Sequence, residues 1–396
     1  MGGTDVSGLV ATVMKISQLY SNISSRGLLI RLMVVHILGT IFAYKVYIKL
    51  SSLGDGYLPE SFTGWYYDGV FSATTLVLGI YHYLDVIFPG VLAPMVLGLV
   101  VAILTWHAFR DVYTQINPKL FWACNLFPLF LVWSGTSSKE QIFIICGIVV
   151  IDFAAKRLFT GYRLKPINLI FVFISLWYMY LSKPNYFVIY FTIFLTSLFA
   201  PFLRKIIINR FSVGVWVLTF ILVIMQVALV ISIDAKFLSE DVIGFMKHVE
   251  YAFLSYEGGS NRTNIQWNDI SDFMYNSLWG IPQGFIGPTL FEAISKPIQF
   301  PVFLEGVVYF FILCYLFVSL FKLSGASNIL RVHILPYIFV ALVIVFISYP
   351  YLIFNAGSAL RYKQNMHPIL IFYPLLILAY ARANNLMKIN IKKDAK

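Results

Sequence analysis

Residues suited to acid–base chemistry stand at two places beside long apolar stretches. Asp55 lies between two glycines just after the first stretch, where a carboxylate can serve as a general base or anchor a cation; the alternative is an ordinary Asp-Gly turn. Lys139 and Glu140 follow five small or hydroxylated residues, SGTSS at 134–138. That run predicts a polar pocket at the ends of two helices, with Ser137 or Ser138 capping the second and Lys139 attracting phosphate; the alternative is a capped turn with a neutral Lys-Glu pair.

Residues suited to phosphate binding form two further clusters. Arg262 follows the turn Gly-Gly-Ser at 258–260, from which a guanidinium can fork onto a phosphate; the alternative is an arginine that only faces water. Arg361, Lys363 and His367 immediately precede the last apolar stretch, and we expect them at the headgroup level of a membrane. There the two cations would hold the phosphates of a lipid, and His367 would act as a donor or acid–base group.

The composition predicts which elements must position these residues. Of 396 residues, 59% are hydrophobic and only 12% are charged, and the mean hydropathy is +0.80, which excludes a soluble globular protein. We therefore expect an all-α, polytopic membrane protein, with residues 1–396 forming one integral membrane domain in a lipid bilayer. A net charge of +11 would suggest nucleic acid in a soluble chain, but here no nucleic-acid partner is expected. The three cysteines lie in apolar runs, so no disulfide is predicted.

We predict about ten transmembrane helices, because a span needs about 20 mostly apolar residues. The third and fourth are short enough to be re-entrant. The predicted spans are residues 28–50, 89–109, 119–134, 141–156, 167–182, 185–203, 211–233, 300–321, 330–352 and 366–384. Residues 1–27 are expected to form an amphipathic surface segment, 70–88 an interfacial or cavity-lining helix, and 234–299 the one large periplasmic loop.

The distribution of charge predicts the orientation. If the N-terminus is cytoplasmic, the short cytoplasmic segments hold 19 Lys and Arg residues, and the longer opposite side holds only eight. Positive charge favours the cytoplasmic side, so both termini are predicted to be cytoplasmic. Most carboxylates then fall on the outer face, which is the expected working face.

Sites for metals and nucleotides are not predicted. The histidines other than His367 are not spaced as metal ligands are, so we expect no metal. No glycine-rich phosphate-binding loop follows a strand, so we expect no cofactor.

Three segments together resemble a known group of bacterial proteins. Residues 126–140 (LFPLFLVWSGTSSKE) are similar to the proline-rich, aromatic, Ser/Gly-Lys-Glu segment of polytopic proteins from surface-polysaccharide gene clusters. Residues 355–363 (NAGSALRYK) resemble their Gly-x-x-x-Arg-Tyr-Arg signature, with Lys363 where Arg is usual. Asp55 resembles the outer-loop acid of the GT-C type glycosyltransferases. The group so indicated is the Wzy-type O-antigen or capsule repeat-unit polymerases, which overlap in architecture with GT-C enzymes.

The resemblance implies a function. Such a polymerase, in the bacterial inner membrane, transfers a growing glycan from one undecaprenyl pyrophosphate to another undecaprenyl-pyrophosphate-linked oligosaccharide on the periplasmic face. Arg361, Lys363, Arg262 and Lys139 would hold pyrophosphate, Asp55 or Glu140 would be the base, and a chain-length regulator would be a partner. Two alternatives stay open: a GT-C type transferase that adds a single sugar from a polyprenyl-phosphate donor, and a flippase for lipid-linked oligosaccharide.

Overall fold

The described part of the chain is helical. The computed structural model describes residues 25–50, 71–160, 165–207, 242–254, 267–325 and 328–394, together with single positions at 64, 221, 224, 262 and 265. These residues form helices and no strand, which confirms the all-α prediction. After a first helix at Ser25–Tyr47, which ends in a π-helical turn, the order is α2 (Ile48–Leu50), α3 (Ala73–Ile87), α4 (Leu92–Phe109), η3 (Tyr113–Gln115), α5 (Pro118–Asn125), α6 (Pro128–Ser134), α7 (Lys139–Thr160), α8 (Pro166–Ser182), α9 (Pro184–Ile207), α12 (Val242–Leu254), α13 (Ile270–Ile286), α14 (Leu290–Ser295), η4 (Pro297–Gln299), α15 (Phe300–Ser324), α16 (Asn328–Ile353), α17 (Ala356–His367), η5 (Pro368–Phe372) and α18 (Tyr373–Asp394).

Five of the described helices are long and apolar enough to cross a membrane. They are Ser25–Tyr47, Leu92–Phe109, Phe300–Ser324, Leu330–Ile353 and Ala356–Asn384, and three shorter apolar helices accompany them at Ala73–Ile87, Pro166–Ser182 and Pro184–Ala200. Many of the large apolar side chains on these helices are exposed, as expected for surfaces that face lipid. The predicted span at 211–233 and the predicted amphipathic segment at 1–27 lie almost wholly outside the described residues.

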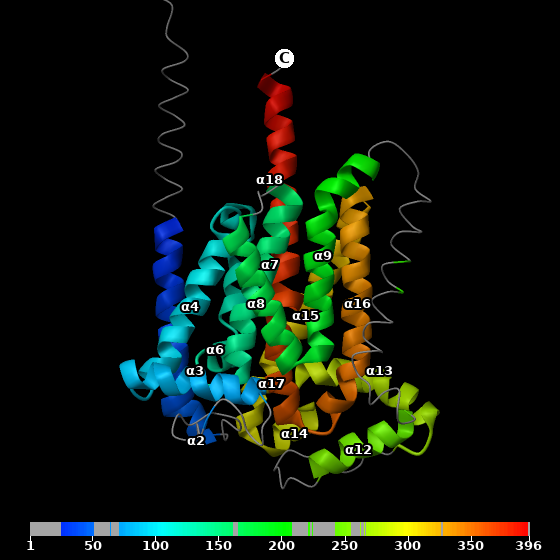
Figure 1. The fold of residues 1–396 in the computed structure, drawn as a ribbon. Helices are drawn as coiled ribbons and strands as arrows, with labels where there is room; N and C mark the ends of the chain where they lie inside the picture. The colour runs from blue at the N-terminus through cyan, green and yellow to red at the C-terminus, as the bar shows by residue number, and fades with distance from the viewer. Residues whose placement is uncertain are drawn as a thin grey trace, which may run out of the picture.

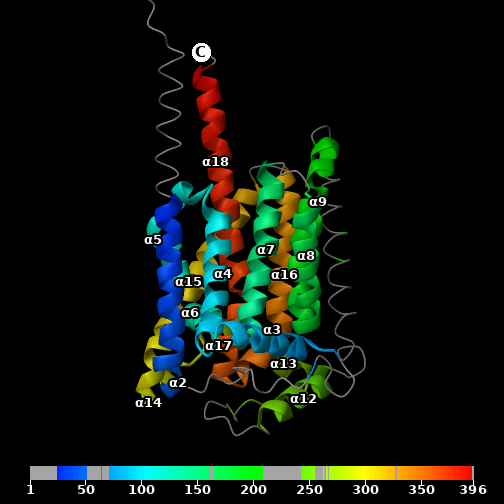
Figure 2. The ribbon, with the colours of Figure 1, turned by 60° about the vertical axis from the view of Figure 1, so that its left-hand side comes forward.

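The long helices stand side by side, and the beginning of the first helix and the end of α18 lie at the same end of the bundle (Figures 1 and 2). The opposite end holds α12, α13, α14 and the start of α17. Helix α3 lies across the long helices at that end and packs against α4, α7 and α8, the orientation expected of an interfacial helix. This end is the one where the sequence places the outer, working face.

Helix α7 forms the centre of the bundle. It packs against α4, α8, α9, α17 and α18, and most of its apolar side chains are buried. Gly147 permits a close approach to α9 and η5, because a Cβ atom there would lie 2.8 Å from the hydroxyl of Tyr190 and 3.1 Å from the ring of Pro368. The two charged residues at the start of this helix, Lys139 and Glu140, are therefore attached to a helix that is packed on several sides.

The predicted third span is two short helices. α5 ends at Asn125, and α6 begins at Pro128 after a break at residues 126–127. Proline disfavours the helical conformation of the residue before it and has no N–H to donate, so Pro128 starts a new helix. The next backbone N–H, that of Leu129, donates a 3.1 Å hydrogen bond to the carboxylate of Glu305 on α15.

The last membrane segment begins about ten residues earlier than the predicted 366–384. Asn355 caps α17, its side chain accepting a hydrogen bond from the backbone N–H of Ser358, and α17, η5 and α18 then follow without a break. The residues predicted to precede a span, Arg361, Lys363 and His367, consequently lie within it.

The predicted loop at 234–299 contains three described α-helices, α12, α13 and α14, and the short 3-10 helix η4. Asp269 caps α13, and its side chain accepts hydrogen bonds from the backbone N–H groups of Ser271 and Asp272. The hydrogen bond that the Ser271 hydroxyl also donates to this carboxylate, together with the two from the backbone, holds the pKa of the Asp269 carboxyl below its usual value. α13 packs against α15, α16 and α17, so much of this region is an integral part of the helical body.

Candidate functional site

The turn at 134–138 is a tightly bonded structure that fixes Glu140. Ser138 caps α7, because its hydroxyl accepts a 3.2 Å hydrogen bond from the backbone N–H of Gln141, as the sequence predicted for Ser137 or Ser138. Gln141 donates to the carbonyls of Ser134 and Pro94 and accepts from the hydroxyl of Tyr81. With its backbone held in this way, the first turn of α7 presents Glu140 in one defined position.

Glu140 meets Arg361 of α17. Their side chains form an ion pair, with Arg361 Nε 3.7 Å from Glu140 Oε1, and both are mostly shielded from solvent, with 17% and 3% of the side chain exposed. The second carboxylate oxygen, Oε2, is buried and has no hydrogen-bond partner among the described residues. The structure thus brings together two predicted site residues that lie in different sequence motifs.

Further positive charge lies beside this pair. The guanidinium of Arg361 lies 4.9 Å from the centre of the Tyr362 ring, and the ammonium of Lys183 lies 4.0 Å from the same ring. Lys139 adjoins Glu140 in the first turn of α7 and is partly exposed. The sequence did not single out Lys183, which stands alone between α8 and α9, and no motif around it would have identified it.

Lys363 and His367 are completely buried within the helical body, so neither side chain is exposed in the way that contact with lipid headgroups would require. The Lys363 ammonium donates a 3.1 Å hydrogen bond to the carbonyl of Phe285 and lies 4.9 Å from the centre of the Tyr309 ring. The His367 ring stacks on Phe130 with 4.2 Å between ring centres. The physical reason is the early start of α17, which places both side chains on its buried face. Their predicted contact with phosphate stays a prediction.

Arg262 joins three segments. Its guanidinium donates to both oxygens of Glu292, to the carbonyl of Ile353 and to the carbonyl of Gly287, all at 2.7–2.8 Å. Burial raises the pKa of the Glu292 carboxyl, but the hydrogen bonds from Arg262 and Thr289 outweigh it and hold that pKa below its usual value. With its donors used in this way, Arg262 has a structural role in this arrangement, and its phosphate contact stays a prediction.

Asp55, the other predicted base, lies outside the described residues. Among the residues that the structure does describe, no group of three or more His, Cys, Asp or Glu side chains is arranged to hold a metal ion.

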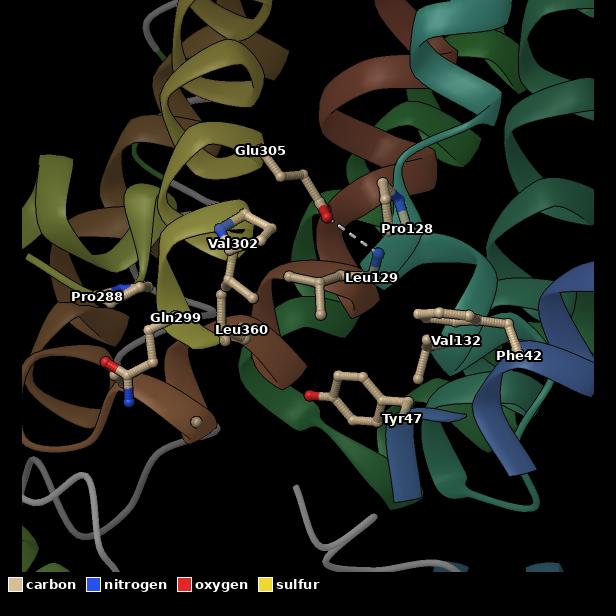
Figure 3. Close-up of a pocket in the computed structure, with 13 residues that line it drawn as sticks. Phe42, Tyr47, Pro128, Leu129, Val132, Pro288, Gln299, Val302, Glu305 and Leu360 are labelled. Carbon is tan, nitrogen blue, oxygen red and sulfur yellow. Dashed lines mark hydrogen bonds between the residues drawn. The ribbon is translucent and has the colours of Figure 1, made fainter. Parts of the chain in front are cut away.

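A pocket of about 430 Å³ opens between the first helix, α6, α15 and α17 (Figure 3). Glu305 contributes its carboxylate to the wall, with one oxygen bound to the Leu129 N–H, as the dashed line in Figure 3 shows. The pocket is lined by Phe42, Tyr47, Pro128, Leu129, Val132, Pro288, Gln299, Pro301, Val302, Glu305, Ala356, Gly357 and Leu360. Sequence analysis did not propose Glu305 as a site residue, although an acid near the start of a long apolar stretch is a usable signal.

Comparison with known protein families, with curated proteins and with solved structures found no match. The fold itself defines the class: this is an all-helical, membrane-embedded protein, and its candidate site is an acid and several cations gathered at one end of the bundle.

Proposed function

We propose that the protein is a glycosyltransferase of the bacterial inner membrane that polymerises undecaprenyl-pyrophosphate-linked oligosaccharide repeat units into surface polysaccharide. The observation that carries this proposal is the meeting of Glu140 and Arg361 at 3.7 Å, since a base and a phosphate-binding cation are the two groups that the reaction requires. Their position at the end of the bundle predicted to face the periplasm, beside lipid-facing helices, suits a substrate that remains in the membrane.

In the proposed reaction the bond between the anomeric carbon of the donor glycan and its pyrophosphate breaks, and a hydroxyl oxygen of the acceptor bonds to that carbon. The hydroxyl proton passes to Glu140, whose Oε2 atom has no hydrogen-bond partner among the described residues. Arg361, with Lys183 and Lys139 close by in the fold, neutralises the charge that develops on the departing undecaprenyl pyrophosphate. The donor bond supplies the free energy, so the reaction needs no nucleotide.

A transporter for lipid-linked oligosaccharide is the second candidate, and one observation favours it. Transporters often contain interrupted membrane helices with charged groups at the interruption. Here a break separates α5 from α6, and the Leu129 N–H in the first turn of α6 donates to Glu305. Polymerisation is preferred because the base and the phosphate-binding cation that it requires meet in one place.

Complementation of a strain that lacks the gene distinguishes these functions. With the wild-type chain, gel analysis of surface polysaccharide should show a ladder of lengths. With Arg361→Ala the ladder should disappear and single capped units should remain, because the pyrophosphate loses its main cation. Lys322→Ala, which removes an exposed cation in the last turn of α15, is the matched control and should leave the ladder intact.

Either of two results would overturn the proposal. A normal ladder with Arg361→Ala, at equal protein level in the membrane, would remove its central residue. Loss of all surface glycan, including single units, in the strain that lacks the gene would instead indicate transport or an earlier step.

A further inference from the structure

The exposed side of α13 is apolar. Ile270, Met274 and Leu278 follow one another at four-residue intervals, so they form one row along the helix, and Tyr275 and Trp279 lie beside that row. Leu278 is 76% exposed and Tyr275 is 70% exposed. Neighbouring apolar side chains on a protein surface mark a place of contact with another apolar body, because their exposure to water costs free energy.

The opposite side of α13 is fixed to the end of a helix that is long and apolar enough to cross the membrane. A Cβ atom at Gly280 would lie 2.8 Å from the side chain of Ile353, the residue at which α16 ends. About one turn earlier on α16, the hydroxyl of Tyr349 donates a hydrogen bond to the carbonyl of Phe273. α13 therefore lies across the bundle at the level where α16 ends (Figure 1), and these contacts hold its apolar row on the outside.

α13 is also attached to α15, which faces lipid. A Cβ atom at Gly306 would lie 1.9 Å from the carbonyl oxygen of Ile286, so the two backbones are in direct contact. Gly306 lies about 9 Å along α15 from its first residue, Phe300. Phe300, Leu304 and Val308 are exposed on the apolar surface of α15. The end of α13 is therefore joined to the lipid-facing part of the protein, a short distance inside the start of α15.

The composition of α13 suits a membrane surface. The helix contains no Lys or Arg, and its one charged residue, Asp272, lies in the first turn and accepts a hydrogen bond from the backbone N–H of Asn268. The indole N–H of Trp279 donates to the side chain of Asn276, so this ring can enter an apolar layer without an unpaired donor. Tyr and Trp are favoured at the headgroup level of a bilayer. They border the apolar row where a protein interface would have a polar rim, which favours lipid as the partner.

We infer that α13 lies in the lipid headgroup layer at this end of the bundle, with Tyr275 and Leu278 inserted among the lipids. The partner of this surface is the bilayer itself. Lys363 of α17 donates to the carbonyl of Phe285 near the end of α13, so the attachment of α13 to the membrane also fixes the level of α17, which carries Arg361. The inference does not depend on the proposed reaction, since it concerns only where α13 lies.

A nitroxide spin label at residue 278 measures the depth of α13 directly. Leu278→Cys is combined with Cys314→Ser, which removes the exposed native thiol, in the full-length protein in phosphatidylcholine nanodiscs. Collisions of the label with oxygen, which concentrates in the bilayer, are compared with collisions with a water-soluble nickel chelate. Phe311→Cys, on the exposed side of α15, is the reference for lipid, and Lys247→Cys, exposed on α12, is the reference for water.

We expect the label at residue 278 to collide more often with oxygen than with nickel. Its depth should be about 5–10 Å into the boundary between headgroups and acyl chains, between the two references. Nanodiscs that contain phosphatidylglycerol should give the same depth, because α13 has no cation to bind an anionic headgroup. Met274→Cys, one turn earlier in the same row, should give the same result and replaces Leu278→Cys if that variant does not fold.

Three outcomes would overturn the inference. Nickel collisions as frequent as at residue 247 would place this side of α13 in water. A label shielded from both reagents would mean that protein covers it, either a second copy of the chain or another partner. A depth that changes with phosphatidylglycerol would mean that charge, and not apolar contact, holds α13 at the membrane. The polysaccharide ladder is a separate readout, so the inference and the proposed reaction can fail independently.

Discussion

Replacing Arg262 by lysine tests whether this arginine stabilises the fold or binds phosphate. Arg262→Lys keeps the positive charge, but an ammonium cannot reproduce the planar fork that bonds to Glu292, Ile353 and Gly287 together. Of the four side-chain hydrogen bonds, we expect one to survive. At about 1 kcal/mol for each lost hydrogen bond, the packing of α14 against Arg262 should be destabilised by about 3 kcal/mol. This corresponds to local opening of α14 that is about a hundredfold more frequent.

Hydrogen–deuterium exchange in α14 measures this opening directly. The amides of Ala293 and Lys296, whose hydrogen bonds lie within that helix, should lose about two orders of magnitude of protection in Arg262→Lys. Phe291→Gln, which changes an exposed side chain of the same helix, is the control and should leave protection unchanged. Unchanged protection in Arg262→Lys, combined with loss of polysaccharide, would refute the structural role and restore the phosphate contact.

The remaining predictions concern pH, packing and the ion pair. The pKa of Glu292 is lower in the folded protein than its ordinary value of 4.5, so the ionised carboxylate stabilises the fold fully above pH 4.5. This stabilisation is lost as the pH falls through the folded pKa. The unfolding temperature of the wild type should therefore drop more below pH 4.5 than that of Glu292→Gln. Gly306→Ala should destabilise the protein by about 1–3 kcal/mol in thermal unfolding, since the added Cβ atom would clash with the backbone carbonyl of Ile286. Gly325→Ala is the control and should be better tolerated, because a Cβ atom there would lie 3.4 Å from the nearest backbone carbonyl oxygen. Exchanging the charges of Glu140 and Arg361 in one double variant should preserve the protein level in the membrane, as judged by immunoblot, but yield no polysaccharide ladder; a restored ladder would show that the pair is only structural.

Much of the helical layout follows from the sequence because lipid-facing helices must be long and continuously apolar. The predicted spans at 28–50, 89–109, 300–321 and 330–352 correspond to long described helices within a few residues. The predicted start of the last membrane segment, residue 366, differs from the start of the helix at Ala356 for a physical reason. Residues 356–367 are too polar to be recognised as membrane-embedded, yet they form a helix whose polar side chains, such as Lys363 and Gln364, are buried against protein.

The candidate site was predictable only in part. Glu140 and Arg361 were singled out separately as charged residues beside apolar stretches, but their contact depends on how α7 and α17 pack, which one sequence does not reveal. Arg262 was assigned to phosphate because its partner Glu292 lies thirty residues away, beyond any local pattern. Glu305 was not proposed as a site residue, because its contact with the Leu129 N–H forms only where α6 begins after the break in another part of the chain.

The short helix α6 connects the two polar regions of the molecule. Its seven residues form a rod about 10 Å long. One end is anchored to α15 through the Leu129 N–H and Glu305, and the other leads directly into the turn that sets the position of Glu140. Because α6 is this short, a displacement of Glu305 on α15 is expected to be transmitted through it to the backbone that carries Glu140.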